Sequence, residues 1–145
     1  MERPRIPARD EFRFRVRLRT RWCDEDNQHV LNNAVYLTLF EEARLAYFTQ
    51  LGFVRANQFP FLLAQTNVLF VAPGQGGAEV LLEARTIELG RTSFTQCYRV
   101  CEATSGTLWA EAEARLVLYD PASGAKREMP PEFRRAIETL EAGRS

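Results

Sequence analysis

The sequence predicts one α+β domain, in which a single antiparallel sheet curls around one long helix. Its 145 residues are enough for a single domain that buries a sizeable core without disulfides. Apolar and polar residues alternate before residue 20 and again in segments after residue 60, a spacing typical of strands. Between these regions the apolar spacing changes to that of a helix, and it does so over one long segment.

The first strand is predicted at Phe12–Arg19, where apolar side chains alternate with arginines. Charges on the outer face of an edge strand prevent pairing with other chains. A phosphate-binding stripe is the alternative interpretation of the arginine row. We expect residues 1–11, which show no periodicity, to form an N-terminal arm that precedes the domain at 12–145.

The long helix is predicted at Ala34–Leu51 from its apolar spacing. Asn32 or Asn33 supplies the N-cap, and Gly52 supplies the left-handed stop. A pair of prolines at 130–131 opens a short C-terminal helix with an apolar stripe. Four strands, separated by proline, glycine and serine turns, are predicted between the helices: Phe61–Ala72, Glu79–Leu89, Phe94–Ala103 and Leu108–Tyr119.

Composition limits the classes of partner and the compartment. Nineteen basic and nineteen acidic residues balance, so no overall charge attracts nucleic acid or an anionic membrane. The sequence has no run like a signal peptide and no apolar run as long as a membrane span. With an odd number of cysteines as well, we expect a cytoplasmic protein with no membrane partner.

Three acids, Asp24, Glu25 and Asp26, lie together between the first strand and the long helix. The only histidine, His29, follows them, and two asparagines come directly before the helix. Asp and Asn before a helix are common caps and turn formers, so a structural role is the simplest interpretation. The alternative is that one carboxylate faces a bound substrate.

The stretch DEDNQHVLNNAVYLTLFEEARLAYF, placed after one strand and before four others, resembles the hotdog-fold thioesterases of the 4-hydroxybenzoyl-CoA and acyl-CoA thioesterase type. The resemblance covers residues 20–48 in detail and nearly the whole chain through the order of its elements. It implies a hotdog fold, in which a five-stranded antiparallel sheet wraps around a central helix. One departure is that His29 stands where the family usually has glycine.

This resemblance also implies which residues act on the thioester. The second acid of the turn, which matches Asp26, is the family's nucleophile or general base. A carboxylate can act alone, because a thiolate leaving group needs little protonation. Backbone N–H groups at the helix start, at Asn33, would polarise the carbonyl. We expect Asp24 to accept hydrogen bonds from turn N–H groups and Glu25 to be solvated, and we expect His29 either to assist catalysis or to be structural.

The remaining site residues also follow from the resemblance. The stretch LGRTSF matches the segment in which the family contacts the phosphates of coenzyme A, so Arg91, Thr92 and Ser93 are candidates, although the same residues suit an ordinary hairpin turn. Tyr36, and Asn67 within an apolar strand, are candidate substrate contacts. The chain has no zinc-ligand spacing and no Gly-x-Ser-x-Gly elbow. We therefore expect no metal, and no cofactor other than the coenzyme A of the substrate.

The predicted function is hydrolysis of an acyl-CoA thioester by a homodimer or homotetramer. We expect subunits to pair through the apolar segment Leu62–Ala72, so that the site takes residues from two chains. One alternative is a hotdog protein that binds acyl chains or coenzyme A without turnover. Another is the hydratase or dehydratase branch of the fold, whose histidine lies in a proline-glycine context that His29 lacks.

Overall fold

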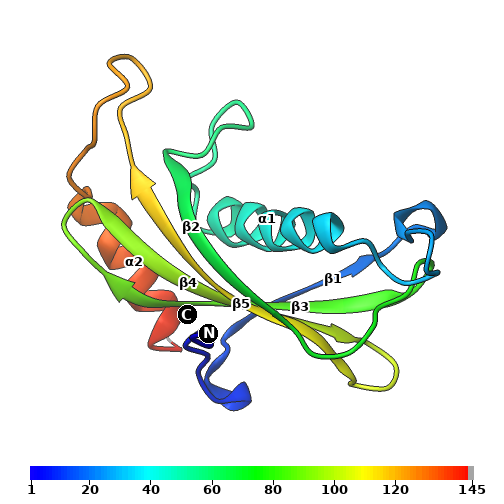
Figure 1. Ribbon diagram of the computed structural model, residues 1–145. Helices are drawn as coiled ribbons and strands as arrows, with labels where there is room; N and C mark the ends of the chain where they lie inside the picture. Colours follow the sequence, from blue (N-terminus) through cyan, green and yellow to red (C-terminus); the bar gives the residue numbers. More distant parts are fainter. Residues whose placement is uncertain (144–145) are drawn as a thin grey trace.

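The computed structural model describes residues 1–143, so the last two residues of the predicted domain lie outside the described part. A five-stranded antiparallel sheet curls around the helix α1 (Asn33–Gln50) (Figure 1). The strands follow the spatial order β1-β3-β4-β5-β2, and the short helix α2 (Pro131–Glu141) follows β5. Their bounds are β1 Phe14–Arg19, β2 Phe61–Phe70, β3 Glu79–Leu89, β4 Ser93–Glu102 and β5 Leu108–Leu118. The predicted architecture is confirmed.

The boundaries of α1 follow from its flanking residues. The side chain of Asn32 accepts a hydrogen bond from the Ala34 N–H at 2.9 Å, which caps the first turn. After the last turn, Gly52 adopts a φ of +84°, a conformation that favours glycine. Both ends of the helix are therefore determined locally.

The concave face of the sheet and the buried face of α1 form the core. Alternate residues of β5 are buried on this face, since Ala112 and Leu116 expose none of their surface. Phe48 on α1 packs against Phe61 at the start of β2 and stacks on Phe133 of α2, with ring centroids 4.9 and 5.4 Å apart. The short helix therefore closes one end of the core.

Ion pairs tie β1 to its neighbour on the outer face of the sheet. Arg15 on β1 and Arg99 on β4 both bind the buried Glu83 on β3, at 3.0 and 2.8 Å. Arg17 pairs with Glu79 at 3.4 Å. Three of the four arginines of the predicted row lie on β1, the edge strand, and these pairs give two of them a structural role.

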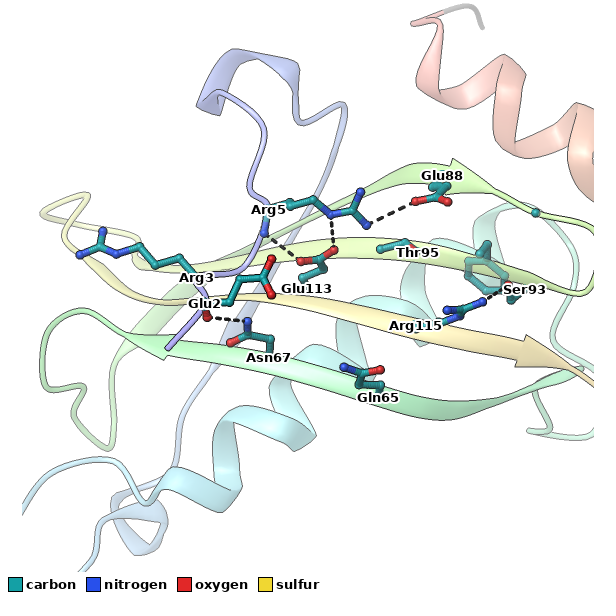
Figure 2. Close-up of a pocket in the computed structure, with 12 residues that line it drawn as sticks. Glu2, Arg3, Arg5, Gln65, Asn67, Glu88, Ser93, Thr95, Glu113 and Arg115 are labelled. Carbon is teal, nitrogen blue, oxygen red and sulfur yellow. Dashed lines mark hydrogen bonds and ion pairs between the residues drawn. The ribbon is translucent and has the colours of Figure 1, made fainter.

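The N-terminal arm crosses the outer face of the sheet, on the side opposite α1 (Figure 2). The Arg5 guanidinium contacts Glu113 on β5 at 2.6 Å and Glu88 on β3 at 3.3 Å. The carbonyl of Glu2 accepts a hydrogen bond from the Asn67 side chain at 3.0 Å. These contacts hold the arm across β2, β5 and β3.

The strand β2 forms the second edge of the sheet and carries exposed apolar side chains. Seven large apolar residues of the described chain are exposed, and five of them lie on β2, directly after it or on α1: Leu37, Leu62, Leu63, Phe70 and Val71. Edge strands with free hydrogen-bonding groups pair readily with another strand. The edge strand β2 and the adjacent part of α1 therefore present most of the exposed large apolar side chains of the described chain.

Candidate active site

Asp24 stabilises the turn that leads into the site. Its carboxylate accepts a hydrogen bond from the Arg21 N–H at 2.8 Å and another from the Arg21 guanidinium at 2.8 Å. These bonds hold the pKa of Asp24 below its usual value. Its backbone carbonyl accepts from the Asn32 N–H at 2.9 Å. The predicted structural role of Asp24 is confirmed.

The prediction that Glu25 is solvated is wrong. One of its carboxylate oxygens accepts a hydrogen bond from the Gly76 N–H at 2.9 Å, in the loop between β2 and β3. Glu25 and Gly76 are far apart in sequence, and only the closed fold brings the loop beside the acid turn. Two of the three neighbouring acids, Asp24 and Glu25, therefore accept hydrogen bonds from backbone N–H groups.

Asp26 differs from its two neighbours because one of its oxygens stays available. Its backbone bonds to Val30 and His29 at 2.9 and 3.1 Å, and its Oδ1 accepts from the Gln28 N–H at 2.8 Å. Within residues 1–143 no group donates a hydrogen bond to Oδ2. The side chain is only partly buried, so this oxygen can meet a ligand.

His29 has the backbone conformation that the resemblance implies for a glycine. Its φ is +61°, in the left-handed region where residues other than glycine are uncommon. The side chain is exposed, and no hydrogen bond joins it to the Asp26 carboxylate in the described chain. The tight turn between Asp26 and Val30 therefore needs the conformation of His29, whatever its imidazole does.

The start of α1 offers a free hydrogen-bond donor close to this turn. The Asn32 N–H is bound to Asp24, and the Ala34 and Val35 N–H groups are bound to Asn32. The Asn33 N–H is the first of the helix and finds no acceptor within the described chain. It also carries partial positive charge from the helix dipole.

A pocket of about 240 Å³ lies against this helix start. It is lined by Val30 and Leu31, by Asn33 and Tyr36 from α1, and by residues 70–74, which run from the last residue of β2 into the following loop. Asp26 is not among these lining residues. The rings of Tyr36 and Phe70 meet edge to face with centroids 5.2 Å apart. Burial raises the pKa of the Tyr36 hydroxyl, and a hydrogen bond from the Gly74 backbone partly offsets this rise. The structure therefore brings the predicted residues Asn33 and Tyr36 into one apolar pocket.

The predicted phosphate contacts lie at the other end of the sheet. Ser93 stands opposite Val117 on β5, beside Leu62, whereas Phe70 stands opposite Ala110. Eight residues of β2 separate the two positions, or about 26 Å at the rise of a strand. Within one chain, the segment at residues 91–93 and the acid turn are therefore far apart.

Arg91 and Thr92 make local contacts in this segment. The Arg91 guanidinium binds Glu128 at 2.7 Å, with both side chains about three-quarters exposed. The backbone carbonyl of Thr92 accepts from the Leu118 N–H at 2.9 Å. An exposed ion pair contributes little stability, so Arg91 can exchange this partner for another anion.

Ser93 and Asn67 line a second, polar pocket of about 370 Å³ on the outer face (Figure 2). Its other walls come from the N-terminal arm and from Arg115, whose guanidinium lies 3.5 Å from the Ser93 hydroxyl. The structure thus separates Asn67 from Tyr36, because Asn67 faces away from α1. Sequence reasoning did not place Arg115 at this site.

The described residues contain no cluster of three or more His, Cys, Asp or Glu side chains that would hold a metal ion. Likewise, none of the helices within residues 1–143 has the length and apolar character to cross a membrane.

The sequence model of the thioesterase-like superfamily matches residues 6–137, which is most of the chain. The chain belongs to the thioesterase-like superfamily. This membership confirms the predicted family and enzyme class, that of thioester hydrolases. A comparison with curated protein sequences gave no match.

Solved structures similar to this thioesterase-like protein confirm the hotdog fold. A thioesterase from Thermus thermophilus, complexed with coenzyme A and Zn, has 32% identity and a TM-score of 0.81, covering 94% of this chain and 99% of that one. A 1,4-dihydroxy-2-naphthoyl-CoA thioesterase from Synechocystis has 20% identity and a TM-score of 0.76, covering 88% of this chain and 97% of the other. At this lower identity the likeness concerns the fold alone.

Proposed function

We propose that this protein hydrolyses an acyl-CoA thioester, with Asp26 as the nucleophile or general base. The observation that carries the proposal is that two groups near the start of α1 lack a hydrogen-bond partner. Asp26 keeps a carboxylate oxygen without a donor, and the Asn33 N–H has no acceptor in the described chain. The Asp26 oxygen can attack the thioester carbon or activate water, and the Asn33 N–H can stabilise the oxyanion that forms.

The chemistry needs only these groups and water. In the general-base route, the Asp26 carboxylate takes a proton from a water molecule, whose oxygen attacks the thioester carbon. In the nucleophilic route, the carboxylate attacks first and water hydrolyses the resulting anhydride. In both routes the carbonyl oxygen becomes negative beside the Asn33 N–H, and the thiolate of coenzyme A leaves. We propose no metal or redox cofactor, and we assign His29 a role in setting the turn.

The proposed site is completed by a second copy of the chain. Two β2 strands paired antiparallel about a two-fold axis would place the Leu62 end of one beside the Phe70 end of the other. This arrangement would carry Arg91, Ser93 and Arg115 of one chain toward Asp26 of its partner. It would also cover the exposed apolar residues of the β2 edge. We therefore propose a homodimer, which can in turn form a tetramer.

In this homodimer the segment at residues 91–93 contacts the phosphates of coenzyme A, with Arg91 and Ser93 as the main contacts and Thr92 beside them. Arg115 adds a cation, since its guanidinium lies near Ser93 and pairs with no acid in residues 1–143. The Thermus thermophilus thioesterase, 32% identical to this chain, was solved with coenzyme A, and this supports a ligand of the same kind here. Tyr36 lines the acyl pocket, whereas Asn67 contacts the nucleotide end, where it lines the same pocket as Ser93.

Release of free thiol from a panel of acyl-CoA esters tests the proposal. The wild type should hydrolyse at least one ester, and Asp26→Asn should lower kcat by about a hundredfold or more. The matched control is Glu42→Gln, which neutralises an exposed acid on α1 and should leave the rate unchanged. Equal rates for wild type and Asp26→Asn would reject the catalytic assignment. Tight coenzyme A binding in calorimetry without hydrolysis of any ester would instead identify a binding protein.

A further inference from the structure

Arg44 is a buried cation without an acidic partner. It lies in the middle of α1, exposes 5% of its surface, and donates one hydrogen bond, from Nη1 to the Tyr98 hydroxyl at 3.2 Å. Its guanidinium carbon also lies 5.5 Å from the centre of the Tyr98 ring. None of the ion pairs in residues 1–143 includes Arg44. Burying a charge without a counter-ion is costly, so a missing anion is expected.

The unused nitrogens of Arg44 are the atoms that remain accessible. Among the described residues, the only fully buried side-chain nitrogen or oxygen without a partner is Oε1 of Glu141. The unbonded Nε and Nη2 of Arg44 must therefore keep some contact with the surface. A guanidinium presents five N–H donors in a planar fork that suits a carboxylate, and Tyr98 uses one of them.

The contact with Tyr98 fixes the position of this guanidinium. The Tyr98 hydroxyl donates its proton to Gln96 at 2.7 Å, and the Gln96 amide donates to Thr86 at 3.1 Å. The hydroxyl oxygen of Tyr98 can then only accept, which it does from Arg44. The sheet therefore supports one side of the guanidinium, and Nε and Nη2 have no hydrogen-bond partner in the described chain.

Arg44 is aligned with the proposed reaction centre. Asn33 and Arg44 are eleven residues apart, which is three helical turns, so they lie on one line of α1, about 16 Å apart along the axis. Leu37, on the same line, is 45% exposed. This flank faces β2, since Phe48 on the same side packs against Phe61. Helical side chains lean toward the N-terminus, which brings the guanidinium closer to Asn33.

We propose that Arg44 binds a carboxylate at the far end of the acyl group, so that the preferred substrates are CoA esters of medium-length dicarboxylic acids. The inference rests on the proposed function and extends it to the substrate class. With its thioester carbonyl at Asn33, the acyl chain would lie over Leu37 and end at the free side of Arg44. The alternative counter-ion is the exposed Glu41 of a second copy, which lies three residues before Arg44 on α1.

The test compares sebacoyl-CoA, which ends in a carboxylate, with decanoyl-CoA, which has the same chain length and ends in a methyl group. We expect the wild type to show a kcat/KM for sebacoyl-CoA about tenfold or more above that for decanoyl-CoA. Arg44→Met keeps most of the apolar stem and should remove this preference, while its kcat/KM for decanoyl-CoA stays within about threefold. Arg44→Lys, which keeps the charge, should retain part of the preference.

Three outcomes would overturn the inference. One is equal kcat/KM for both esters in the wild type, and another is an equal loss for both in Arg44→Met, which would mark a structural role. The third is that Arg44→Met and Glu41→Gln both convert a dimer to monomers in light scattering, which would assign Glu41 of the second copy as the counter-ion. If the wild type hydrolyses neither of these esters and no other ester of the acyl-CoA panel, the proposed function is rejected. Calorimetry with sebacate would then decide, because binding by wild type and not by Arg44→Met supports the inference, and any other result overturns it.

Discussion

Gly74 and the Tyr36 hydroxyl are in closer contact than any larger residue would permit. A methyl group built on Gly74 would lie 2.6 Å from the Tyr36 oxygen and 2.7 Å from the ring of Trp109. The carbonyl of the same glycine accepts the Leu31 N–H at 2.9 Å. The end of β2 is therefore joined through Gly74 to both the acid turn and the first turn of α1.

Gly74→Ala should disturb the site more than the fold. The added methyl group must displace Tyr36 or Trp109, and such overpacking costs about 1–3 kcal/mol of stability. Because Gly74 contacts Tyr36 and accepts the Leu31 N–H close to the helix start, we expect kcat/KM for thioester hydrolysis to fall by about tenfold, a typical cost of misplacing a reacting group. Urea denaturation and thiol release measure the two effects.

The control is Gly77→Ala in the same loop. Gly77 has a φ of +71° but no atom within 4 Å of a built methyl group, so the substitution costs about 1 kcal/mol through the backbone alone. It should leave hydrolysis unchanged. Equal activity losses in the two variants would show that the Gly74 contact does not position the site.

Asp24→Asn should reduce stability and Asp26→Asn should reduce activity. An asparagine at 24 turns an amide donor toward Arg21 and loses one of the acceptors, at a cost of about 1–3 kcal/mol. At 26 it keeps the acceptor for the Gln28 N–H, so stability should change little. Urea denaturation of both variants, compared with their hydrolysis rates, measures this separation. Loss of both properties in both variants would contradict it.

The dimer predicts a double substitution that separates the chains. Leu62→Glu with Leu63→Glu places like charges on an apolar edge and should give monomers in sedimentation, with hydrolysis reduced at least about tenfold. Trp22→Glu is the control, because Trp22 is 82% exposed but lies outside β2 and α1. The two-chain site would be refuted if the wild type sediments as a monomer and still hydrolyses thioesters, or if the double variant is a monomer with the wild-type rate.

The sequence predicted the elements because each signal is local. The alternation on β1, the Asn32 cap and the Gly52 stop depend only on neighbours in the chain. The resemblance placed His29 at a position where the family has glycine, and the structure gives this residue a positive φ, which glycine favours. These local features determine the ends of the long helix and the turn that carries Asp26 in the proposed site.

Contacts between distant segments were not predictable in the same way. Glu25 binds Gly76 because a later loop returns to the acid turn, and nothing near Glu25 signals this. The polar pocket around Ser93 exists because the arm crosses the sheet to Glu113. Likewise, Arg44 bonds to the hydroxyl of Tyr98, which lies on β4, far away in the sequence. The burial of Arg44 therefore became apparent only in the fold.

The partly buried carboxyl group of Glu141 predicts a pH-dependent contribution to stability. One of its oxygens accepts from the Thr86 N–H at 2.6 Å and from the Tyr47 hydroxyl at 2.7 Å, which holds the end of α2 on the sheet. Burial raises the pKa of Glu141, although these bonds and nearby Arg85 and Arg13 oppose the rise. Its ionisation therefore disfavours the folded state.

The sign of the effect follows from linkage. A folded pKa above the unfolded value means that the stabilising contribution is complete below the ordinary value of 4.5 and is lost as pH rises through the raised pKa. Glu141→Gln keeps an acceptor oxygen and does not titrate, so its stability relative to wild type should increase as the pH rises from 4.5 through the raised pKa of Glu141.

Glu141→Ala is the control for this experiment, because it leaves the Thr86 N–H without its acceptor and removes one partner of the Tyr47 hydroxyl, and it should lose about 1–3 kcal/mol throughout. Urea denaturation at each pH gives the three free energies of unfolding. Because the pKa of Asp24 is lowered, its contribution makes the free energy of unfolding rise with pH, and only below about pH 4. Asp24 is present in all three proteins, so its effect cancels in the differences between them. A constant difference between wild type and Glu141→Gln across this range would mean that the buried carboxylate does not titrate on folding.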